Sequence, residues 1–254
     1  MGMGKPNVLV LRAAGTNCDG ETVHAFELAG AVAKRRHVRE LLDRPAELDE
    51  FQILALPGGF SYGDDIAAGR ILADQFNRRL ADPLKKFVDA GKPIIGICNG
   101  FQVLLQTDLL PGPSFGPAGS RVSLADNAVP RFQDRWVRLA RGSDRCVWTR
   151  EMPEPFEVPI AHGEGRLAVD SPATVDALDA GGFVALRYAD ENPNGSAGDV
   201  AGLTDETGLV LGLMPHPERY VVAAQHAAWA RRKENPAAEA AGLSIFRAGV
   251  AAVS

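Results

Sequence analysis

Cysteine is scarce in this sequence, with three residues in 254. Cys18, Cys98 and Cys146 are too few and too far apart for a disulfide framework or a cysteine-rich zinc site, so we expect no metal centre. Such sparse cysteine is typical of a reducing compartment and predicts a cytoplasmic protein. No apolar run approaches about 18 residues, and Met1 to Asn7 lacks the apolar core of a signal peptide. The sequence therefore predicts no membrane association.

Excess positive charge is also absent. The formal net charge is −5, which leaves no electrostatic case for a nucleic acid or an anionic membrane as a partner. The sequence contains no G-x-x-x-x-G-K-[S/T] loop, so no phosphate-binding site for ATP is predicted in this chain. Internal repeats, heptads and linkers are likewise missing. With an ordinary globular composition, residues 1–254 are predicted to form a single domain.

Apolar runs alternate with helical patterns in the first half of the chain and recur at its end. Buried strands are predicted over Val8–Leu11, Ile53–Leu56, Pro93–Ile97 and Leu209–Met214, and Ala31–Val38 is a candidate for a second strand. Helices are predicted over Gly20–Ala29 with Asp19 as cap, Ile66–Ala90 with a break near Asp82-Pro83, Gly100–Gln106, Ala223–Lys233 and Leu243–Ala252. This alternation predicts an α/β fold with a doubly wound, mostly parallel sheet and helices on both faces.

Beyond Leu109 the pattern changes to short strands between Pro- and Gly-rich loops. We expect antiparallel strands to extend the same sheet, at Arg121–Leu124, Trp136–Leu139 and Phe156–Ile160. A hairpin around Asn192-Pro193-Asn194-Gly195 is predicted from Phe183–Tyr188 and Val200–Leu203. The charged stretch Ala161 to Arg166 is predicted to be a flexible loop.

Cys98 stands at a predicted strand-to-helix turn. Gly96 precedes it by two residues and Gly100 follows it by two, which gives G-x-C-x-G, the thiol form of a nucleophile elbow. A sulfur at the first turn of a helix meets the positive end of the helix dipole, which favours the thiolate. The alternative is a buried core cysteine, because free cysteine is among the most buried residue types. The two flanking glycines favour the nucleophile.

A histidine and a carboxylate follow the last predicted strand. His216 and Glu218 lie in Pro215-His216-Pro217-Glu218, where the prolines exclude helix and strand and present both side chains on a stiff turn. A thiol nucleophile needs a base, and the base needs a group that fixes its tautomer. The alternative is a surface histidine beside a solvated glutamate. One imidazole without a surrounding run of ligands argues against a metal site.

Two adjacent glycines follow the strand Ile53–Leu56. Gly58 and Gly59 leave backbone N–H groups uncovered at the carboxyl end of a buried strand, close to whatever binds there. A plain turn is the alternative. Because the pair precedes the Cys98 elbow by one β-α unit, it stands where a backbone donor of an oxyanion hole belongs.

These three stretches together resemble the class I, or triad, glutamine amidotransferases. Three further stretches narrow the resemblance to the glutaminase subunits of phosphoribosylformylglycinamidine synthase, in purine biosynthesis: Arg12–Asp19 with Glu21, Pro159–Arg166 and Asn192–Arg219. The resemblance covers nearly the whole chain. It implies a flavodoxin-like sheet with the site at the carboxyl ends of the strands.

The resemblance also implies a role for each residue of the site. Cys98 would attack the side-chain amide of glutamine and form a thioester. Backbone N–H groups of Gly59 and Asn99 would bind the oxyanion. His216 would protonate the departing ammonia and then activate water, and Glu218 would orient His216.

Three other residues are candidates for substrate binding. Gly58 belongs to the oxyanion turn. Gln102 lies one helical turn beyond Cys98 and either contacts the substrate amino acid or is a polar residue of the helix surface. The resemblance places His162 near the glutamine site or the interface with the synthetase. No role in the chemistry is expected for the remaining cysteines and histidines, namely Cys18, Cys146, His24, His37 and His226.

A synthetase subunit is the partner that the resemblance implies. ATP and Mg²⁺ would bind that partner, and the need for a small third subunit stays open. Two other functions are kept: a non-catalytic docking subunit that regulates a synthetase, and a glutaminase that serves another synthetase. Peptidase and chaperone relatives of this fold commonly have a histidine directly after the cysteine, where this chain has Asn99. The α/β-hydrolases have their acid before the histidine, and Glu218 follows it here.

Overall fold

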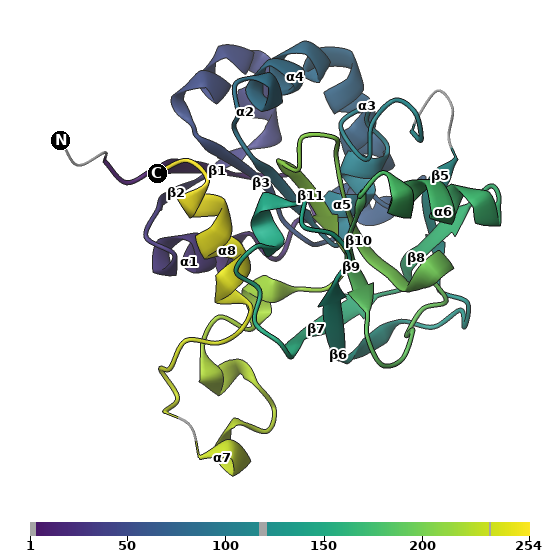
Figure 1. Ribbon diagram of the computed structural model, residues 1–254. Helices are drawn as coiled ribbons and strands as arrows, with labels where there is room; N and C mark the ends of the chain where they lie inside the picture. Colours follow the sequence, from purple (N-terminus) through teal and green to yellow (C-terminus); the bar gives the residue numbers. More distant parts are fainter. Residues whose placement is uncertain (1–3, 117–120, 234) are drawn as a thin grey trace.

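A central sheet of nine strands runs through the molecule (Figure 1). The computed structural model describes residues 4–116, 121–233 and 235–254. The strand order is β2-β1-β3-β4-β11-β10-β9-β6-β7, and β5 and β8 form a separate two-stranded sheet. The strands are β1 (Asn7–Arg12), β2 (Val32–His37), β3 (Ile53–Leu56), β4 (Ile94–Ile97), β5 (Val122–Asp126), β6 (Gln133–Arg141), β7 (Phe156–His162), β8 (Glu164–Val169), β9 (Val184–Tyr188), β10 (Val200–Thr204) and β11 (Val210–Leu213).

The first five strands of this order are parallel, and all but β2, which is mostly exposed, carry an apolar core pattern. β1 pairs with β2 and β3, and β4 pairs with β3 and β11, all in parallel. Every residue of β3, β4 and β11 is buried, as expected of strands covered on both faces. The order 2-1-3-4 is that of a flavodoxin-like sheet, so the predicted fold class is confirmed.

The other four strands extend the sheet in antiparallel fashion. β10 pairs with both β11 and β9, which confirms the predicted hairpin, and β6 joins β9 to β7. Two predictions are wrong here. β5 does not join the main sheet, because its antiparallel partner is β8. Ala161 to Arg166 is not a flexible loop, since β7 ends at His162 and β8 begins at Glu164, with Gly163 alone between them.

Helices cover both faces of the sheet (Figure 1). α1 and α8 pack together on one face, with the rings of Phe26 and Phe246 5.0 Å apart, while α3 contacts α4 and α5 on the other. The helices are α1 (Asp19–Leu28), α2 (Val38–Asp43), α3 (Arg70–Arg79), α4 (Ala81–Asp89), α5 (Asn99–Leu105), α6 (Pro172–Ala180), α7 (Trp229–Arg232) and α8 (Leu243–Ala251). In the described part of the chain, no helix is long and apolar enough to cross a bilayer.

Three helix predictions need correction. The predicted helix Ile66–Ala90 starts only at Arg70, and its break lies at Leu80. Pro83 itself does not interrupt a helix, because it lies in the first turn of α4, where a missing N–H costs no intrahelical bond. Asp19 is not a side-chain cap: it is the first residue of α1 and pairs with arginines. Ala223–Lys233 is not one helix, because only a short turn and α7, which buries none of its residues, form there.

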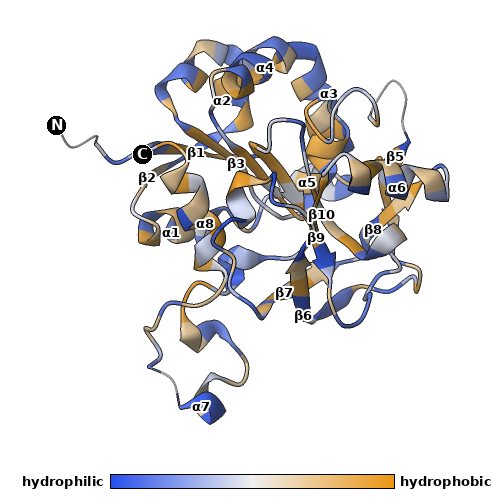
Figure 2. Cartoon of the chain, in the orientation of Figure 1, coloured by the Kyte–Doolittle hydropathy of each residue, from blue (hydrophilic) through white to orange (hydrophobic). Residues whose placement is uncertain are grey.

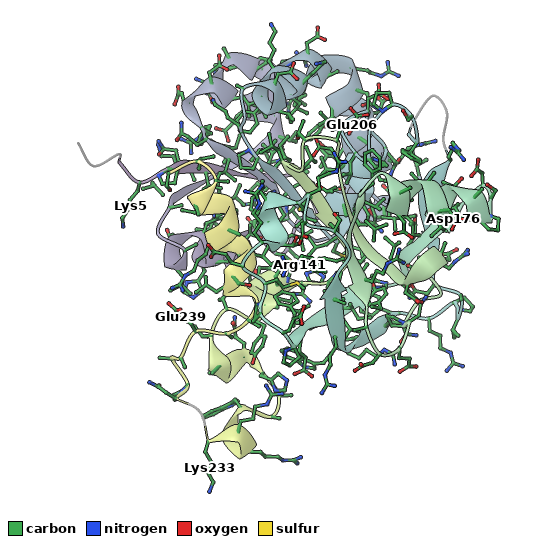
Figure 3. The ribbon with its side chains drawn as sticks, viewed as in Figure 1. Lys5, Arg141, Asp176, Glu206, Lys233 and Glu239 are labelled. Atoms are coloured by element: carbon green, nitrogen blue, oxygen red, sulfur yellow. The ribbon has the colours of Figure 1, made fainter. Side chains whose placement is uncertain are left out.

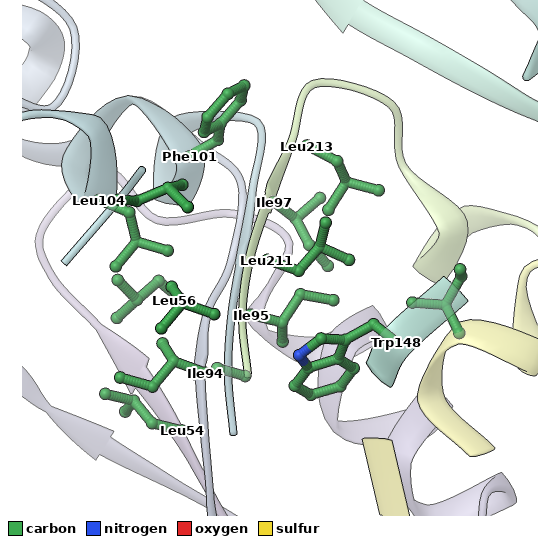
Figure 4. Packing of buried hydrophobic residues seen from close by; sticks show 14 of the residues in the cluster. Leu54, Leu56, Ile94, Ile95, Ile97, Phe101, Leu104, Trp148, Leu211 and Leu213 are labelled. Carbon is green, nitrogen blue, oxygen red and sulfur yellow. The ribbon is translucent and has the colours of Figure 1, made fainter. Parts of the chain in front are cut away.

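The core lies between the sheet and its helices. Figure 4 shows Ile94, Ile95 and Ile97 of β4 packed among neighbours from β3, β11 and α5, with Trp148 beside them. Hydropathy follows this arrangement, since the central strands are apolar and the outer surfaces of the helices are polar (Figure 2). Charged side chains such as Lys5, Asp176 and Lys233 lie at the periphery (Figure 3). The strands that carry the site residues are thus held by a continuous apolar core.

Candidate active site

Cys98 occupies a sharp turn between β4 and α5. Its backbone has φ 52° and ψ −106°, a left-handed conformation that a side chain rarely adopts and that is found at strained functional turns. The flanking glycines allow the turn, since a Cβ added at Gly100 would lie 2.0 Å from the Leu56 carbonyl oxygen, and one at Gly96 would lie 2.6 Å from the Gly100 oxygen. Only glycine lets α5 approach β3 and β4 this closely. The sequence-based elbow is therefore present.

His216 and Glu218 form a buried pair after β11. His216 Nδ1 lies 2.5 Å from Glu218 Oε1, and the two side chains are 1% and 0% exposed. The His216 N–H donates to the Pro159 carbonyl at 2.8 Å, which ties the turn to β7. Because Nδ1 is engaged by the carboxylate, Nε2 faces the rest of the site, and it has no hydrogen-bond partner among the described residues.

Strand pairing brings the cysteine and the histidine together. Ile97 of β4 is in register with Leu213 of β11, and the Cys98 N–H donates to the Leu213 carbonyl at 2.7 Å. β4 and β11 therefore end at the same edge of the sheet, where β4 is followed by the thiol and β11 by the imidazole. The Cys98 Sγ lies 3.8 Å from the Ala161 carbonyl oxygen at the end of β7.

The charges around His216 favour its protonated form. Burial disfavours a charged ring, but the Glu218 carboxylate and the Cys98 thiol outweigh it, so the pKa of His216 lies well above its usual value. The Cys98 sulfur thus has a cationic imidazole as its neighbour. Cys146 has the opposite surroundings, since burial raises the pKa of its thiol to about 11. The surroundings of Cys98 thus favour a reactive cysteine, and those of Cys146 favour an inert one.

Backbone donors stand where the oxyanion is expected. Asn99 is the first residue of α5, so its N–H has no partner within the helix. Gly59, with φ 149°, forms a bridge with Thr16 whose two bonds use the N–H groups of Asn17 and Phe60. The N–H of Gly59 is not used in that bridge. Both predicted donors therefore lie at the carboxyl ends of β3 and β4, and their role stays a prediction.

The amide side chains of α5 are engaged within the protein. Asn99 Oδ1 accepts from the Ser61 N–H at 3.1 Å, and its Nδ2 donates to Gln102 Oε1 at 2.9 Å. Gln102 Nε2 donates to the Glu164 carbonyl at 2.6 Å, and the residue is 5% exposed. Gln102 is thus not a helix-surface residue: it links the elbow to the β7-β8 corner. It also borders a cavity of about 400 Å³ together with Glu164 and Arg70.

His162 is buried beside the site. Its Nδ1 lies 3.0 Å from Asn127 Oδ1, while Nε2 has no hydrogen-bond partner among the described residues. Burial, and then the nearby charge of His216, lower the pKa of His162 to about 4. The ring is therefore neutral at pH 7. Its proximity to His216 agrees with a place near the substrate site, and its role in substrate binding stays a prediction.

Comparison with known proteins identifies the family. The model of the CobB/CobQ-like glutamine amidotransferase domain matches residues 5–252. Phosphoribosylformylglycinamidine synthase subunit PurQ of Dehalococcoides mccartyi is 43% identical over 255 residues, covering 96% of each chain. The chain belongs to the PurQ family of glutamine amidotransferases. The PurQ of Treponema denticola is 40% identical and covers 86% of this chain and 89% of its own.

Solved structures place this PurQ-family chain among the amidotransferase folds. A structure of PurLQS from Thermotoga maritima matches with a TM-score of 0.73 and 32% identity, over 96% of this chain and 97% of the other. A second glutamine amidotransferase from Thermotoga maritima has a TM-score of 0.54 at 17% identity, over 92% of this chain and 88% of its own, which shows the fold alone. The similarity to the PurQ family thus extends over the fold as well as the sequence.

Most of the predicted site is brought together in this PurQ-family chain, and one residue was missed. Cys18 was expected to have no role, yet its thiol faces His216, and together with Glu218 their ligand atoms lie within 4.8 Å of one another. That set offers ligands for a metal ion, but His216 Nδ1 is already bonded to Glu218, which favours the catalytic interpretation. The other residues for which no role in the chemistry was expected lie as follows: Cys146 is buried, His24 is exposed, His37 caps α2 and His226 packs on Trp136.

Proposed function

We propose that this chain is the glutaminase subunit of a phosphoribosylformylglycinamidine synthase and supplies ammonia for purine biosynthesis. The observation that carries the proposal is the Cys98 elbow beside the buried His216–Glu218 pair. It occurs in a chain that matches a PurQ at 43% identity over 96% of its length. The support thus comes from the geometry of the site and from sequence similarity.

In the first half of the reaction, the Cys98 sulfur attacks the side-chain amide carbon of glutamine. The carbonyl oxygen becomes an oxyanion, which the N–H groups of Gly59 and Asn99 are placed to bind; one such donor contributes about 3–4 kcal/mol. His216 carries a proton at neutral pH and gives it to the amide nitrogen. Ammonia leaves, and glutamate stays attached to Cys98 as a thioester.

In the second half, water hydrolyses the thioester. His216, now neutral, accepts a proton from water as it attacks the thioester carbon. The same oxyanion donors act again, and the Cys98 thiolate leaves with glutamate released. Glu218 holds the ring through Nδ1 in both halves, which keeps Nε2 directed toward the sulfur and the water.

A synthetase subunit would receive the ammonia. Two exposed aromatic side chains near the site support a docking surface: Phe60, 48% exposed, follows Gly59, and Phe132, 55% exposed, lies against Gly163 of the β7-β8 corner. ATP and Mg²⁺ are assigned to the partner, because this sequence has no phosphate-binding loop. The described similarity to PurLQS is compatible with a third subunit. A cytoplasmic location is proposed from the three free cysteines.

Reconstitution with the synthetase tests the proposal. The purified chain, mixed with the synthetase, ATP, Mg²⁺ and formylglycinamide ribonucleotide, should form the amidine from glutamine. Cys98→Ala should abolish this activity, while added ammonium chloride should still support the synthetase. Cys146→Ser is the matched control, since it removes a buried thiol outside the site. Glutamine-dependent amidine formation by Cys98→Ala would refute the proposal.

The same assay separates the other two functions. A non-catalytic docking subunit would change the ammonia-dependent rate of the synthetase without releasing glutamate. A glutaminase for another synthetase would release glutamate, but formylglycinamide ribonucleotide would not be converted. The buried His216–Glu218 pair favours the catalytic interpretation over docking alone, because a surface used only for contact needs no buried charge pair.

A further inference from the structure

The Cys18 sulfur and the Cys98 Cβ both lie beside the open side of Gly58, where a side chain would stand. A Cβ added at Gly58 would lie 3.2 Å from the Cys18 sulfur, 3.4 Å from the Cys98 Cβ and 2.8 Å from His216 Cε1. Gly58 is buried and has no side chain, so nothing from this residue separates the two cysteines. The Cys98 sulfur is one bond from its Cβ, and rotation about the Cα–Cβ bond changes its distance from Cys18.

Arg219 sets the chemistry of Cys18. Its Nη2 donates to the Cys18 sulfur at 3.0 Å, and Cys18 is fully buried at the start of α1. Reactive cysteines are found in electropositive surroundings of this kind. His216 lies on the other side of the thiol and contributes a second positive charge. Cys18 thus has the surroundings of a reactive cysteine, although the proposed glutaminase mechanism does not use it.

We propose that Cys18 and Cys98 form a reversible disulfide when Cys98 is oxidised by a peroxide, so that Cys18 is the resolving cysteine of a modification site. The proposal rests on Cys98 being the reactive thiolate of the proposed glutaminase. Cysteines that act in redox control are often placed next to a resolving cysteine, and Cys18 and Cys98 both lie beside Gly58.

The reaction has two steps. In the first, the Cys98 thiolate attacks one oxygen of hydrogen peroxide: an S–O bond forms, the O–O bond breaks, hydroxide leaves, and the sulfur loses two electrons to the peroxide. In the second, the Cys18 thiolate attacks the Cys98 sulfenic acid: the S–S bond forms, the S–O bond breaks, and the departing hydroxide takes a proton from His216 and leaves as water. The hydroxide of the first step takes a proton from solvent, so two thiolates, one peroxide and two protons become one disulfide and two waters.

The disulfide stops glutamine hydrolysis, because the attacking sulfur is engaged. It also protects that sulfur, because a sulfur in a disulfide is not oxidised further to the sulfinic acid. Formation of the sulfinic acid is irreversible in most proteins. A dithiol such as dithiothreitol reverses the bond by two exchange steps and restores both thiols. The expected consequence is an enzyme that peroxide inactivates and a dithiol reactivates.

Peptide mapping tests the bond itself. The full chain is treated with hydrogen peroxide, free thiols are alkylated, and the protein is digested without reduction. A pair of peptides joined through Cys18 and Cys98, two hydrogens lighter than their sum, is the expected result. Cys146 should remain a free thiol, because it is buried elsewhere. Oxidised Cys98 found together with alkylated Cys18 would overturn the proposal. This readout needs no glutamine turnover, so it is separate from any failure of the proposed function.

Recovery of activity provides the second test. Wild type, Cys18→Ser and Cys146→Ser are inactivated with peroxide and then incubated with dithiothreitol, and each rate is expressed relative to the same variant before oxidation. Wild type and Cys146→Ser should recover most of their rate. Cys18→Ser should lose most of it permanently, with sulfinic acid at Cys98 in the mass spectrum. Equal recovery in all three would show that Cys18 does not resolve the oxidised cysteine.

Discussion

Replacement of His162 by glutamine should make the protein less sensitive to acid. The ring is buried, and its pKa is lowered to about 4 from an ordinary value near 6.5. The unfolded chain therefore takes up a proton that the folded ring refuses. Stability that is complete above about pH 6.5 is lost as the pH falls toward the folded pKa. The loss attributable to His162 is about 2 kcal/mol at pH 5 and about 3 kcal/mol at pH 4.

Urea unfolding at pH 7.5 and pH 5 measures this loss. The decrease in the free energy of unfolding between the two values should be about 2 kcal/mol smaller in His162→Gln than in wild type. The amide of glutamine can still bond to Asn127, and His24→Gln is the matched control because His24 is exposed. The raised pKa of His216 acts in the opposite direction, since its contribution is lost as the pH rises, and it is common to all three proteins. Equal pH dependence in wild type and His162→Gln would refute the reasoning.

Three further predictions concern the site and its support. Glu218→Gln leaves His216 buried without its charge partner, so kcat/KM should fall by about a hundred- to several-thousand-fold. Glu191 is exposed, so Glu191→Gln is the control and should change kcat/KM little. A diazo-ketone analogue of glutamine should label Cys98 and spare Cys146; label found mainly on Cys146 in a peptide map would contradict the assignment of the nucleophile. Gly100→Ala should lower the free energy of unfolding by about 2–3 kcal/mol, because the added Cβ meets the Leu56 carbonyl oxygen, and a urea midpoint equal to that of wild type would argue against this close packing.

The elbow and the His-Pro-Glu turn were predictable because their information is local. An apolar run, two glycines around a cysteine and two prolines around a histidine define these turns without reference to distant residues. The parallel strands followed from the same apolar runs, and the flavodoxin-like sheet that the resemblance implies is present.

Long-range contacts explain what the sequence pattern missed. Cys18 meets Arg219 across 201 positions of the chain, a contact that exists only because β1 and β11 end at the same edge of the sheet. The pairing of β5 with β8 instead of the main sheet is likewise set by register with a distant strand. Residues 223–233 have good helix formers, but α7 has no buried face, and Figure 1 shows it on a projection from the body.

The pairing of β4 with β11 also determines how the two catalytic turns can be separated. Cys98 and His216 follow β4 and β11, two adjacent buried strands. The distance between neighbouring strands is about 4.8 Å in any sheet. Separation of the two strand ends therefore requires opening the centre of the sheet, which exposes the core of the molecule. Amide hydrogen exchange at the Cys98 N–H, bonded to the Leu213 carbonyl, should then proceed only through global unfolding. A partner that regulates this site would act more easily on the Gly59 turn and the β7-β8 corner, which lie outside that ladder.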